Sequence, residues 1–332
     1  MATHDIVTIG ASAGGIETLR RLLSMLPADL PAAIMVVQHL HPHTPSSLDQ
    51  ILARAGTLPV QFAQDHQRIE PGHVYLAPPD NHLLVEPARL RVVRGPRENR
   101  HRPAVDPLFR SAAWAYGPRV VGIVLSGTLD DGASGLWAVR SCGGTTIVQD
   151  PADALHAEMP TSALMTLNVD HCLPLGEIAV LLPKLARQEV NGRRPVTPPE
   201  ALGLEVAVAT REHDTDVEDM RKLGKPAGFT CPTCKGSLWE LNEGELSVFR
   251  CHIGHAFAPD SLQAAQAEEV EVALESALRA LEEQGAAARR LGDRLDEKVP
   301  ALAARYDAQA AGLEDQAAVI RKLLRRGIKL HD

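Results

Sequence analysis

Ser12 is the first residue of the chain whose surroundings suggest catalysis. It lies within Gly10-Ala-Ser-Ala-Gly14, where an apolar run gives way to an amphipathic pattern. The pattern G-x-S-x-G is typical of a nucleophilic serine on a sharp strand-to-helix turn, because small neighbours leave the hydroxyl exposed. A helix that starts there presents free N–H groups and a positive dipole end to a developing oxyanion. A turn of small residues that only permits close packing fits the same letters.

Phosphate binding is the weaker interpretation of this turn. Ser12 stands where the dinucleotide-binding pattern G-x-G-x-x-G has its second glycine, and the next apolar run ends in Gln38-His39 without a clear acidic residue. A P-loop needs Gly-Lys-Ser/Thr, whereas Lys184 is the only lysine among the first 200 residues. The sequence therefore favours a nucleophile over a nucleotide-binding turn.

A base and a carboxylate stand at the ends of two other apolar runs. His39 follows "AAIMVVQ", and Asp130 and Asp131 follow "VVGIVLSGTL". The carboxyl ends of parallel strands line one edge of an open sheet, where ligands usually bind. Ser12, His39 and one aspartate would then meet as nucleophile, base and orienting carboxylate. Their chain order differs from the Ser, Asp, His order of α/β-hydrolases, which disfavours an ordinary lipase or esterase.

Each of these residues also has a simpler interpretation. His39 could pack or cap, and His41 and His43 compete with it for the role of base. Either aspartate could cap the helix that follows, which is a common position for aspartate. The three strand ends together, rather than any one residue, favour a hydrolase.

A second set of chemically active residues lies near the C-terminus. Cys231 and Cys234 form C-x2-C, and after 16 intervening residues Cys251 and His255 form C-x3-H. Two such pairs on opposed turns can close a tetrahedron around zinc. His252 is an alternative fourth ligand, but we favour His255 because adjacent residues seldom reach one metal.

The stretch between these pairs predicts a small zinc-ribbon-like unit. "SLWELNEGELSVFRC" is typical of two strands around Asn242-Glu243-Gly244. A unit of this size is barely stable without a metal, and four protein ligands leave no open position, so a structural zinc is expected. The alternative is a reduced cysteine cluster in a small core. Cys142 and Cys172 have no partners at metal spacing, and we expect both to be buried apolar residues.

The surrounding pattern predicts the elements that position these residues. Short branched runs alternate with amphipathic stretches up to about residue 190, which indicates a three-layer α/β/α fold with a mainly parallel sheet. Residues 80–98 predict a hairpin around Pro87-Ala88 at one edge of that sheet. We predict four parts: a catalytic domain (1–190), a linker (191–228), the zinc-ribbon-like unit (229–258) and a helical region (259–332). The leucine faces of the last part form a core, a helical hairpin, or a contact with a partner or second copy.

Composition limits the classes of function. The 332 residues suffice for two domains, and 45% hydrophobic residues supply a core. A net charge of −8 and an aromatic content of 3% argue against nucleic-acid binding. The N-terminus lacks a signal-peptide pattern, and no apolar stretch approaches membrane-spanning length. We therefore expect a cytoplasmic protein without membrane insertion.

Residues 5 to about 187 resemble the catalytic domain of chemotaxis protein-glutamate methylesterases (CheB-type). The matching blocks, in order, are "IGASAGGIETL", "VVQHLHP", "PGHVYLAPPDNHL", "NRHRPAVDPLF", "GIVLSGTLDDGASG" and "EMPTSAL". The resemblance implies a Rossmann-like methylesterase fold and hydrolysis of glutamate γ-methyl esters on chemoreceptor helices, often with deamidation of glutamine. It implies no cofactor for catalysis.

The resemblance also assigns roles to residues. It places the catalytic triad on Ser12, His39 and Asp131, since Asp131 directly precedes the Gly-Ala of "DDGASG". Ala13 stands where the family commonly has threonine, and Gly127-Thr-Leu129 where "GMG" is usual. Both departures concern substrate preference and oxyanion geometry more than the reaction class.

The remaining predictions concern partners and control. Arg100 and Arg102 could bind an acidic receptor helix or could be solvated loop charges, while His101 is a poor candidate for catalysis. Because Met1 lies five residues before the first catalytic strand, we expect no phospho-receiver domain ahead of it. Our hypothesis is that the zinc-helical region regulates the site instead. The alternative function is a regulatory scaffold in which the esterase fold binds a signalling partner.

Overall fold

The computed structural model describes residues 2–190, 199–210, 217–243, 246–296 and 298–326. The chain divides into two compact units, Met1–Leu262 and Gln263–Asp332. Each unit is described on its own below.

A seven-stranded sheet forms the centre of the first unit. Its order is β3-β4-β2-β1-β7-β8-β9, and every strand pair in it is parallel. β1 and β2 are buried along their whole length, which suits continuous branched runs covered on both faces. The strands are β1 Ile6–Ala11, β2 Ala33–Gln38, β3 Val60–Phe62, β4 Val74–Leu76, β7 Val120–Val124, β8 Thr145–Gln149 and β9 His171–Leu173.

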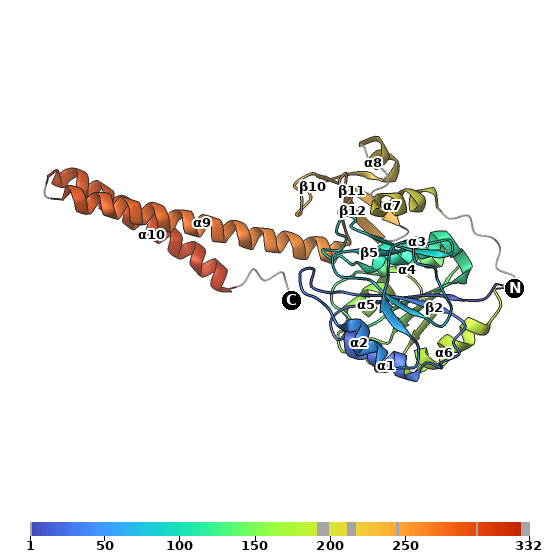
Figure 1. Cartoon of the computed structure of the whole chain (residues 1–332). Coiled ribbons are helices and arrows are strands. Elements are labelled where there is room, and N and C mark those ends of the chain that lie inside the picture. The colour runs from blue at the N-terminus through green and yellow to red at the C-terminus, as the bar shows by residue number, and fades with distance from the viewer. Residues whose placement is uncertain (1, 191–198, 211–216, 244–245, 297, 327–332) are drawn as a thin grey trace. The chain divides into compact units, whose positions relative to one another are not determined.

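Helices cover both faces of this sheet and complete the predicted three-layer α/β fold (Figure 1). The first layer consists of α1 Gly15–Met25, α2 Leu48–Ala53 and α6 Leu175–Arg187. The second consists of α3 Val105–Tyr116, α4 Ala133–Ser141 and α5 Glu158–Thr166, with the short 3-10 helix η1 Gly117–Arg119 before β7.

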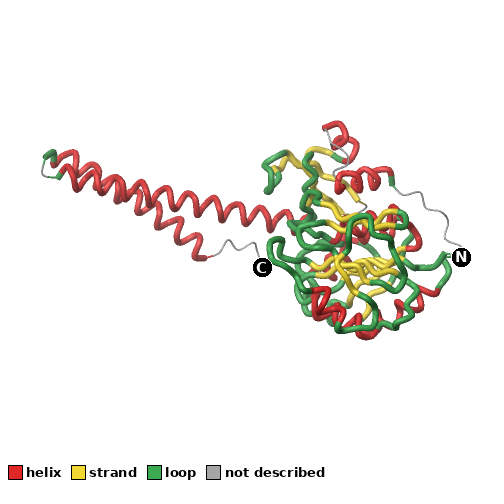
Figure 2. The backbone as a smooth tube through the Cα atoms, viewed as in Figure 1, coloured by secondary structure: helices red, strands yellow, loops and turns green. Residues whose placement is uncertain are grey.

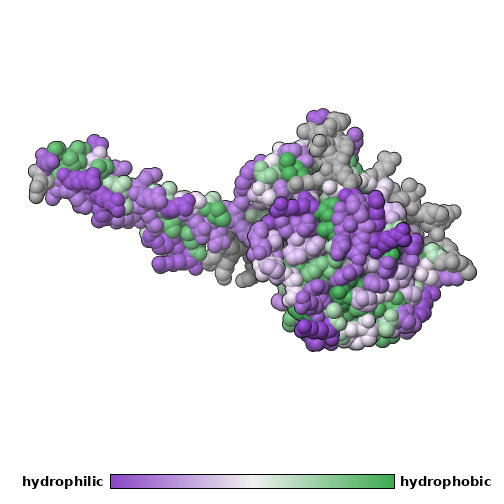
Figure 3. All heavy atoms as spheres, viewed as in Figure 1, coloured by the Kyte–Doolittle hydropathy of each residue, from purple (hydrophilic) through white to green (hydrophobic). Residues whose placement is uncertain are grey.

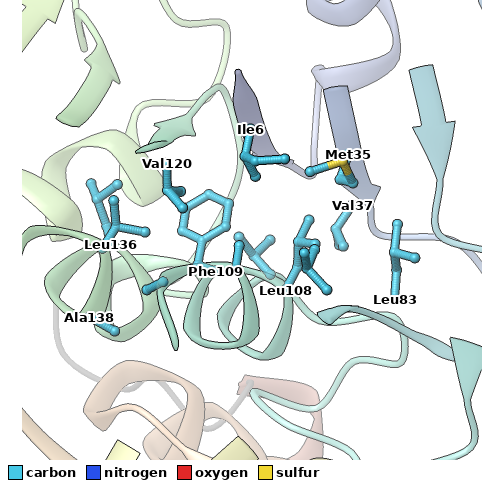
Figure 4. Close-up of a cluster of buried hydrophobic side chains, with 14 of the residues drawn as sticks. Ile6, Met35, Val37, Leu83, Leu108, Phe109, Val120, Leu136 and Ala138 are labelled. Atoms are coloured by element: carbon cyan, nitrogen blue, oxygen red, sulfur yellow. The ribbon is translucent and has the colours of Figure 1, made fainter. Parts of the chain in front are cut away.

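The α3 side of the core shows how side chains join sheet and helix. Leu108 and Phe109 point from α3 toward Ile6, Met35 and Val120 on three different strands (Figure 4). All five are almost completely buried. Burial of one such side chain contributes roughly 1.5–3 kcal/mol, so this face alone fixes α3 firmly against the sheet.

The predicted hairpin exists, but its placement at the edge of the main sheet was wrong. β5 His82–Glu86 and β6 Arg89–Val93 pair antiparallel as a separate two-stranded sheet. The hairpin packs on α3 instead, where the Ser111 hydroxyl accepts a hydrogen bond from the Val85 N–H at 3.0 Å. Leu83 and Leu90 are fully buried there, so the apolar face of the hairpin finds its cover on a helix.

The predicted linker range contains two helices, α7 Glu200–Thr210 and α8 Val217–Leu223. α7 packs on α3 and buries Leu202, Glu205 and Val208. Its apolar residues are spread around the helix rather than along one stripe, so the sequence lacks the usual period. Residues 191–198 and 211–216 of the predicted linker lie outside the described residues.

A four-stranded antiparallel sheet follows and confirms the two strands predicted between the cysteine pairs. Its order is β10-β11-β12-β13, with β11 pairing β12 from Leu238↔Cys251 to Glu243↔Leu246. Its small core includes Trp239, Leu241 and Val248. The strands are β10 Lys225–Thr230, β11 Ser237–Glu243, β12 Leu246–Cys251 and β13 Ala256–Phe257.

The second unit is a pair of helices. α9 runs from Pro259 to Leu295, beginning in the first unit, and α10 from Pro300 to Arg326 (Figures 1 and 2). Ala303, Ala310 and Ala317 are buried at seven-residue spacing, whereas most of the surface is hydrophilic (Figure 3). The pattern is that of an antiparallel helical hairpin joined through small residues. Among the described residues, the helices are too short or too polar to cross a membrane.

Candidate functional site

Ser12 lies in the turn between β1 and α1. Its N–H donates to the Ser126 carbonyl at 3.0 Å, which ties the turn to the segment after β7. Gly14 has φ +72°, a conformation that favours glycine. A Cβ on Gly127 would lie 2.9 Å from the Ser12 Cβ. Gly14 and Gly127 thus allow the turn after β1 and the segment after β7 to lie close to Ser12.

His39 links Ser12 to an aspartate. Its Nδ1 lies 3.0 Å from the Ser12 Oγ, and its Nε2 lies 2.7 Å from the Asp131 Oδ2. An ionised carboxylate only accepts, so the pair with Asp131 places the ring proton on Nε2. Nδ1 is then the lone-pair nitrogen that faces the serine hydroxyl. This is the geometry of a nucleophile, a general base and an orienting carboxylate.

Asp131 is held as a carboxylate by donors around it. Burial opposes its charge, but the hydrogen bond and charge of His39 and further N–H donors keep its pKa well below the usual range. Oδ2 accepts from the Val105 N–H at 2.7 Å and Oδ1 from the Asp106 N–H at 3.2 Å. Both donors belong to the start of α3, where free N–H groups and the helix dipole favour an anion. Asn99 Nδ2 donates to Oδ1 at 2.9 Å.

Asp130 has a different neighbourhood from Asp131. It caps the start of α9, accepting from the Asp260 N–H at 2.8 Å and the Ser261 N–H at 3.3 Å, with the Ser261 hydroxyl as a third donor. Burial raises the pKa of Asp130 to about 6 despite these donors. The contact with His39 therefore belongs to Asp131, and Asp130 joins the catalytic domain to the segment after β13.

The other histidines take no comparable position. His101 stacks on His39 with ring centroids 3.7 Å apart. Burial and the nearby His39 lower the pKa of His101 to about 3, so it forms a neutral wall beside the ring. His41 and His43 are exposed, and the His41 Nδ1 contacts the Thr44 hydroxyl.

The two arginines predicted to bind substrate differ in their surroundings. Arg102 is mostly buried, and its guanidinium pairs with Asp80 at 2.6 Å and donates to the Gly95 carbonyl at 2.7 Å. This pairing holds the Arg102 guanidinium within the fold, and a role for Arg102 in substrate binding stays a prediction. Arg100 is half-buried, with φ +71°.

The cysteines and histidine of the second motif come together in the structure. Cys231, Cys234, Cys251 and His255 each offer one ligand atom, and all four atoms lie within 4.8 Å of one another. Cys234 Sγ lies 3.7 Å from Cys251 Sγ, and His255 Nδ1 lies 3.8 Å from Cys231 Sγ and 3.6 Å from Cys251 Sγ. Sulfur ligands about 2.3 Å from a tetrahedral zinc lie about 3.8 Å from each other. The group could therefore hold a metal ion, and His252 is not part of it.

Comparison with known proteins decides the family. The CheB methylesterase family matches residues 7–182, more than half of the chain. The chain belongs to the CheB methylesterase family. A putative protein-glutamate methylesterase/protein-glutamine glutaminase of Leptospira interrogans is 35% identical over 191 residues, which cover 57% of this chain and 99% of that protein. A protein-glutamate methylesterase/protein-glutamine glutaminase 1 of Xanthomonas campestris is 41% identical, covering 56% of this chain and 53% of its own length.

A solved structure agrees with the sequence comparisons. The CheB methylesterase catalytic domain of Thermotoga maritima superposes with a TM-score of 0.52 and 34% identity, covering 55% of this chain and 98% of that domain. The family match ends at residue 182, so the Cys3His group lies outside the part of the chain shared with the CheB methylesterases.

Sequence reasoning missed several buried polar residues next to the CheB-type site. Glu98, Asn99 and Asp106 lie beside or within the block "NRHRPAVDPLF", which carried the family signal but no assigned role for them. Arg110 directly follows that block and was not given a role either. Glu205 and Arg250 gave no signal, because Arg250 pairs with Glu205 across 45 positions and with Glu98 across 152. The expectation for Cys172 was also wrong: it lies on the edge strand β9 and is exposed, while Cys142 is buried as expected.

Proposed function

We propose that this chain hydrolyses the γ-methyl ester of glutamate side chains on a methylated chemoreceptor or a similar signalling protein, releasing methanol. The observation that carries the proposal is the bridge from Ser12 through His39 to Asp131, within a domain of the CheB methylesterase family. The relatives that are named protein-glutamate methylesterase supply the substrate class.

The geometry suggests how the chain performs the reaction. The His39 Nδ1 takes the Ser12 proton as Oγ attacks the ester carbonyl, while Asp131 holds the imidazolium through Nε2. Backbone N–H groups of the turn after Ser12 would stabilise the oxyanion. Methanol leaves with the proton from Nδ1, and water then hydrolyses the acyl-enzyme by the same steps. Deamidation of glutamine would follow the same route, with ammonia as the leaving group.

The surface around Ser12 fits a protein substrate. Leu155 is 73% exposed, and its Cδ2 would lie 3.0 Å from a Cβ placed on Gly14. An exposed leucine beside the nucleophile turn offers an apolar contact to an amphipathic helix. Arg100 and Arg102 are the two residues predicted to contact acidic residues of such a helix.

The Cys3His group is proposed to bind a structural zinc ion. Thiolates and imidazole are the donors that zinc prefers, and four protein ligands fill its coordination. Free thiols held for a metal suit a reducing compartment, in agreement with a cytoplasmic protein. Protein purified without chelator should contain close to one zinc per chain, and zinc near zero would contradict the proposal.

Methanol release from a methylated receptor tests the esterase. Wild type should release methanol, and Ser12→Ala should lose at least about 1000-fold in rate because the nucleophile is gone. Ser24→Ala, a change at an exposed position near the end of α1, serves as the control and should keep the wild-type rate. Equal release by wild type and Ser12→Ala would overturn the serine mechanism and favour the scaffold alternative.

A further inference from the structure

We propose that Asn99 positions the triad carboxylate Asp131, and that the metal-binding sheet β10–β13 holds Asn99 in place, so that esterase activity depends on the metal at the Cys3His group. The inference rests on the proposed esterase function and adds a regulation of that same site. The β10–β13 sheet, which would exert this control, lies outside residues 7–182, the segment that matches the family.

Every polar group of the buried Asn99 side chain has a partner. Its Nδ2 donates to Asp131 Oδ1 at 2.9 Å and to Asp106 Oδ2 at 2.7 Å. Its Oδ1 accepts from the Ala258 N–H at 2.8 Å. Because the Ala258 N–H can only donate, it fixes which end of the amide faces the two carboxyl groups. The backbone N–H of Asn99 donates to the Ala256 carbonyl at 2.8 Å.

The position between Asp106 and Asp131 requires a donor. Both carboxyl groups are fully buried. Burial and the charge of Asp131 raise the pKa of Asp106 well above its usual range, while Asp131 stays ionised. The two N–H bonds of Asn99 satisfy one oxygen on each side. An amide turned the other way would place its oxygen against both carboxyl groups and disturb the Asp131–His39 contact.

The loop that carries Asn99 has a backbone conformation that needs support. Asn99 has φ +47° and Arg100 has φ +71°, in a region that residues other than glycine rarely occupy. Such conformations persist only where surrounding contacts determine them. Here β13 provides those contacts, since the Ala256 N–H also donates to the Arg97 carbonyl at 3.3 Å.

The contacts to Asn99 come from the segment that the metal would hold. Cys251 ends β12 and His255 directly precedes β13, so two ligands bracket the turn between these strands. Ala256 and Ala258 therefore lie one and three residues after a ligand. Arg250, next to Cys251, pairs with Glu98 at 3.1 Å, so the residue before Asn99 is anchored to β12 as well.

Metal removal from the full-length wild type is the first test. Chelation followed by readdition of Zn²⁺ should lower methanol release by about 100-fold and then restore it, because a carboxylate displaced by about 1 Å loses this much. Hydrogen exchange, measured in parallel, should rise over residues 97–106 in the metal-free chain while β1 and β2 stay protected. Unchanged release and unchanged exchange after removal of the metal would overturn the inference.

Asn99→Asp is the second test, with Asn168→Asp at an exposed turn as the matched control. The Asn99 variant replaces a donor by an acidic side chain beside Asp131, which contacts His39. It should lose about 100-fold in rate, and the acid limb of its pH–rate profile should move to higher pH, since added negative charge favours the imidazolium. The control should keep both rate and profile. If Asn99 had only a structural role, the variant would lose rate without a shift of the acid limb, and this result would contradict the positioning role.

The two tests separate the inference from the function on which it rests. If metal-loaded wild type releases no methanol, the proposed function fails, and the exchange measurement alone decides the link between metal and residues 97–106. If wild type is active but equally active without metal, only the inference fails. Should Asn99→Asp not fold, the metal-removal test decides, since it uses the unchanged sequence.

Discussion

The two sheets of the first unit are stabilised in different ways. The seven-stranded sheet has large apolar cores on both faces, whereas the cluster of buried apolar side chains at the β10–β13 sheet has five members among the described residues, one of them an alanine. At about 25 cal/mol per Å² of apolar area, the first sheet gains ample stability from burial and the second gains little. We therefore expect the smaller sheet to depend on its Cys3His group and on its attachment to the catalytic domain.

Buried charges make an important part of that attachment, beside the hydrogen bonds of Asn99. Glu98, Arg110, Glu205 and Arg250 form a buried cluster of two positive and two negative side chains. Arg250 comes from the small sheet and the other three from the catalytic domain and α7. Breaking a buried pair leaves an uncompensated charge, so such a cluster specifies one docking geometry more than it adds stability.

Metal removal should produce the largest difference in stability between the two sheets. Structural zinc contributes on the order of 10 kcal/mol to the folding of small zinc units, so β10–β13 should lose its order while the seven-stranded sheet remains. Cys251→Ser should behave in the same way in the presence of zinc. Hydrogen exchange that stays equally protected in β11 and β12 of the metal-free protein would show that the small sheet needs no metal.

Glu98→Gln tests how much the buried charge cluster stabilises the attachment of the β10–β13 sheet to the catalytic domain. Burial opposes the charge of Glu98, but Arg110 and Arg250 lower its pKa from 4.5 to about 2. A lowered carboxyl pKa stabilises the fold above the unfolded pKa, and this stability is lost as the pH falls from about 4.5 toward 2. A shift of this size corresponds to about 3 kcal/mol.

The expected result is a difference in pH dependence. The urea midpoint of the wild type should fall more steeply between pH 5 and about pH 3 than that of Glu98→Gln, which should be less stable than wild type at pH 7. Parallel profiles would mean that the Glu98 charge does not hold the two parts together. The Cys3His group is identical in both proteins, so its contribution to the comparison cancels.

Arg289→Ala should have the smallest effect. Arg289 pairs with Glu314 between α9 and α10, but both side chains are more than half exposed. Exposed pairs contribute about 0.2–1 kcal/mol, so the loss of stability in the second unit should not exceed this range. A loss as large as that of Glu98→Gln would contradict the distinction between exposed and buried pairs.

The sequence predicted what depends on local pattern. Branched runs located β1, β2 and β7, and their carboxyl ends identified Ser12, His39 and the pair Asp130-Asp131. The family resemblance selected Asp131, and the structure places it in contact with His39. The C-x2-C and C-x3-H spacings likewise predicted one metal site from Cys231 to His255, because metal ligands on tight turns have this spacing. Local pattern thus carried most of the fold and both candidate sites.

Long-range pairing was beyond this reasoning. Asn99 meets Ala258 across 159 positions, and Glu98 meets Arg250 across 152. Such contacts leave no period or spacing in the sequence. The hairpin β5–β6 was predicted correctly as a local element but misplaced, since only the tertiary structure shows that α3 covers it.

The most direct test of the catalytic account is covalent labelling with a fluorophosphonate, located by peptide mass spectrometry. An activated nucleophile should react, so we expect one adduct per chain on Ser12 in metal-loaded wild type and at least about 100-fold slower labelling in His39→Ala. An adduct on another serine, or equal labelling rates in wild type and His39→Ala, would contradict the assignment of Ser12 and His39 as nucleophile and base.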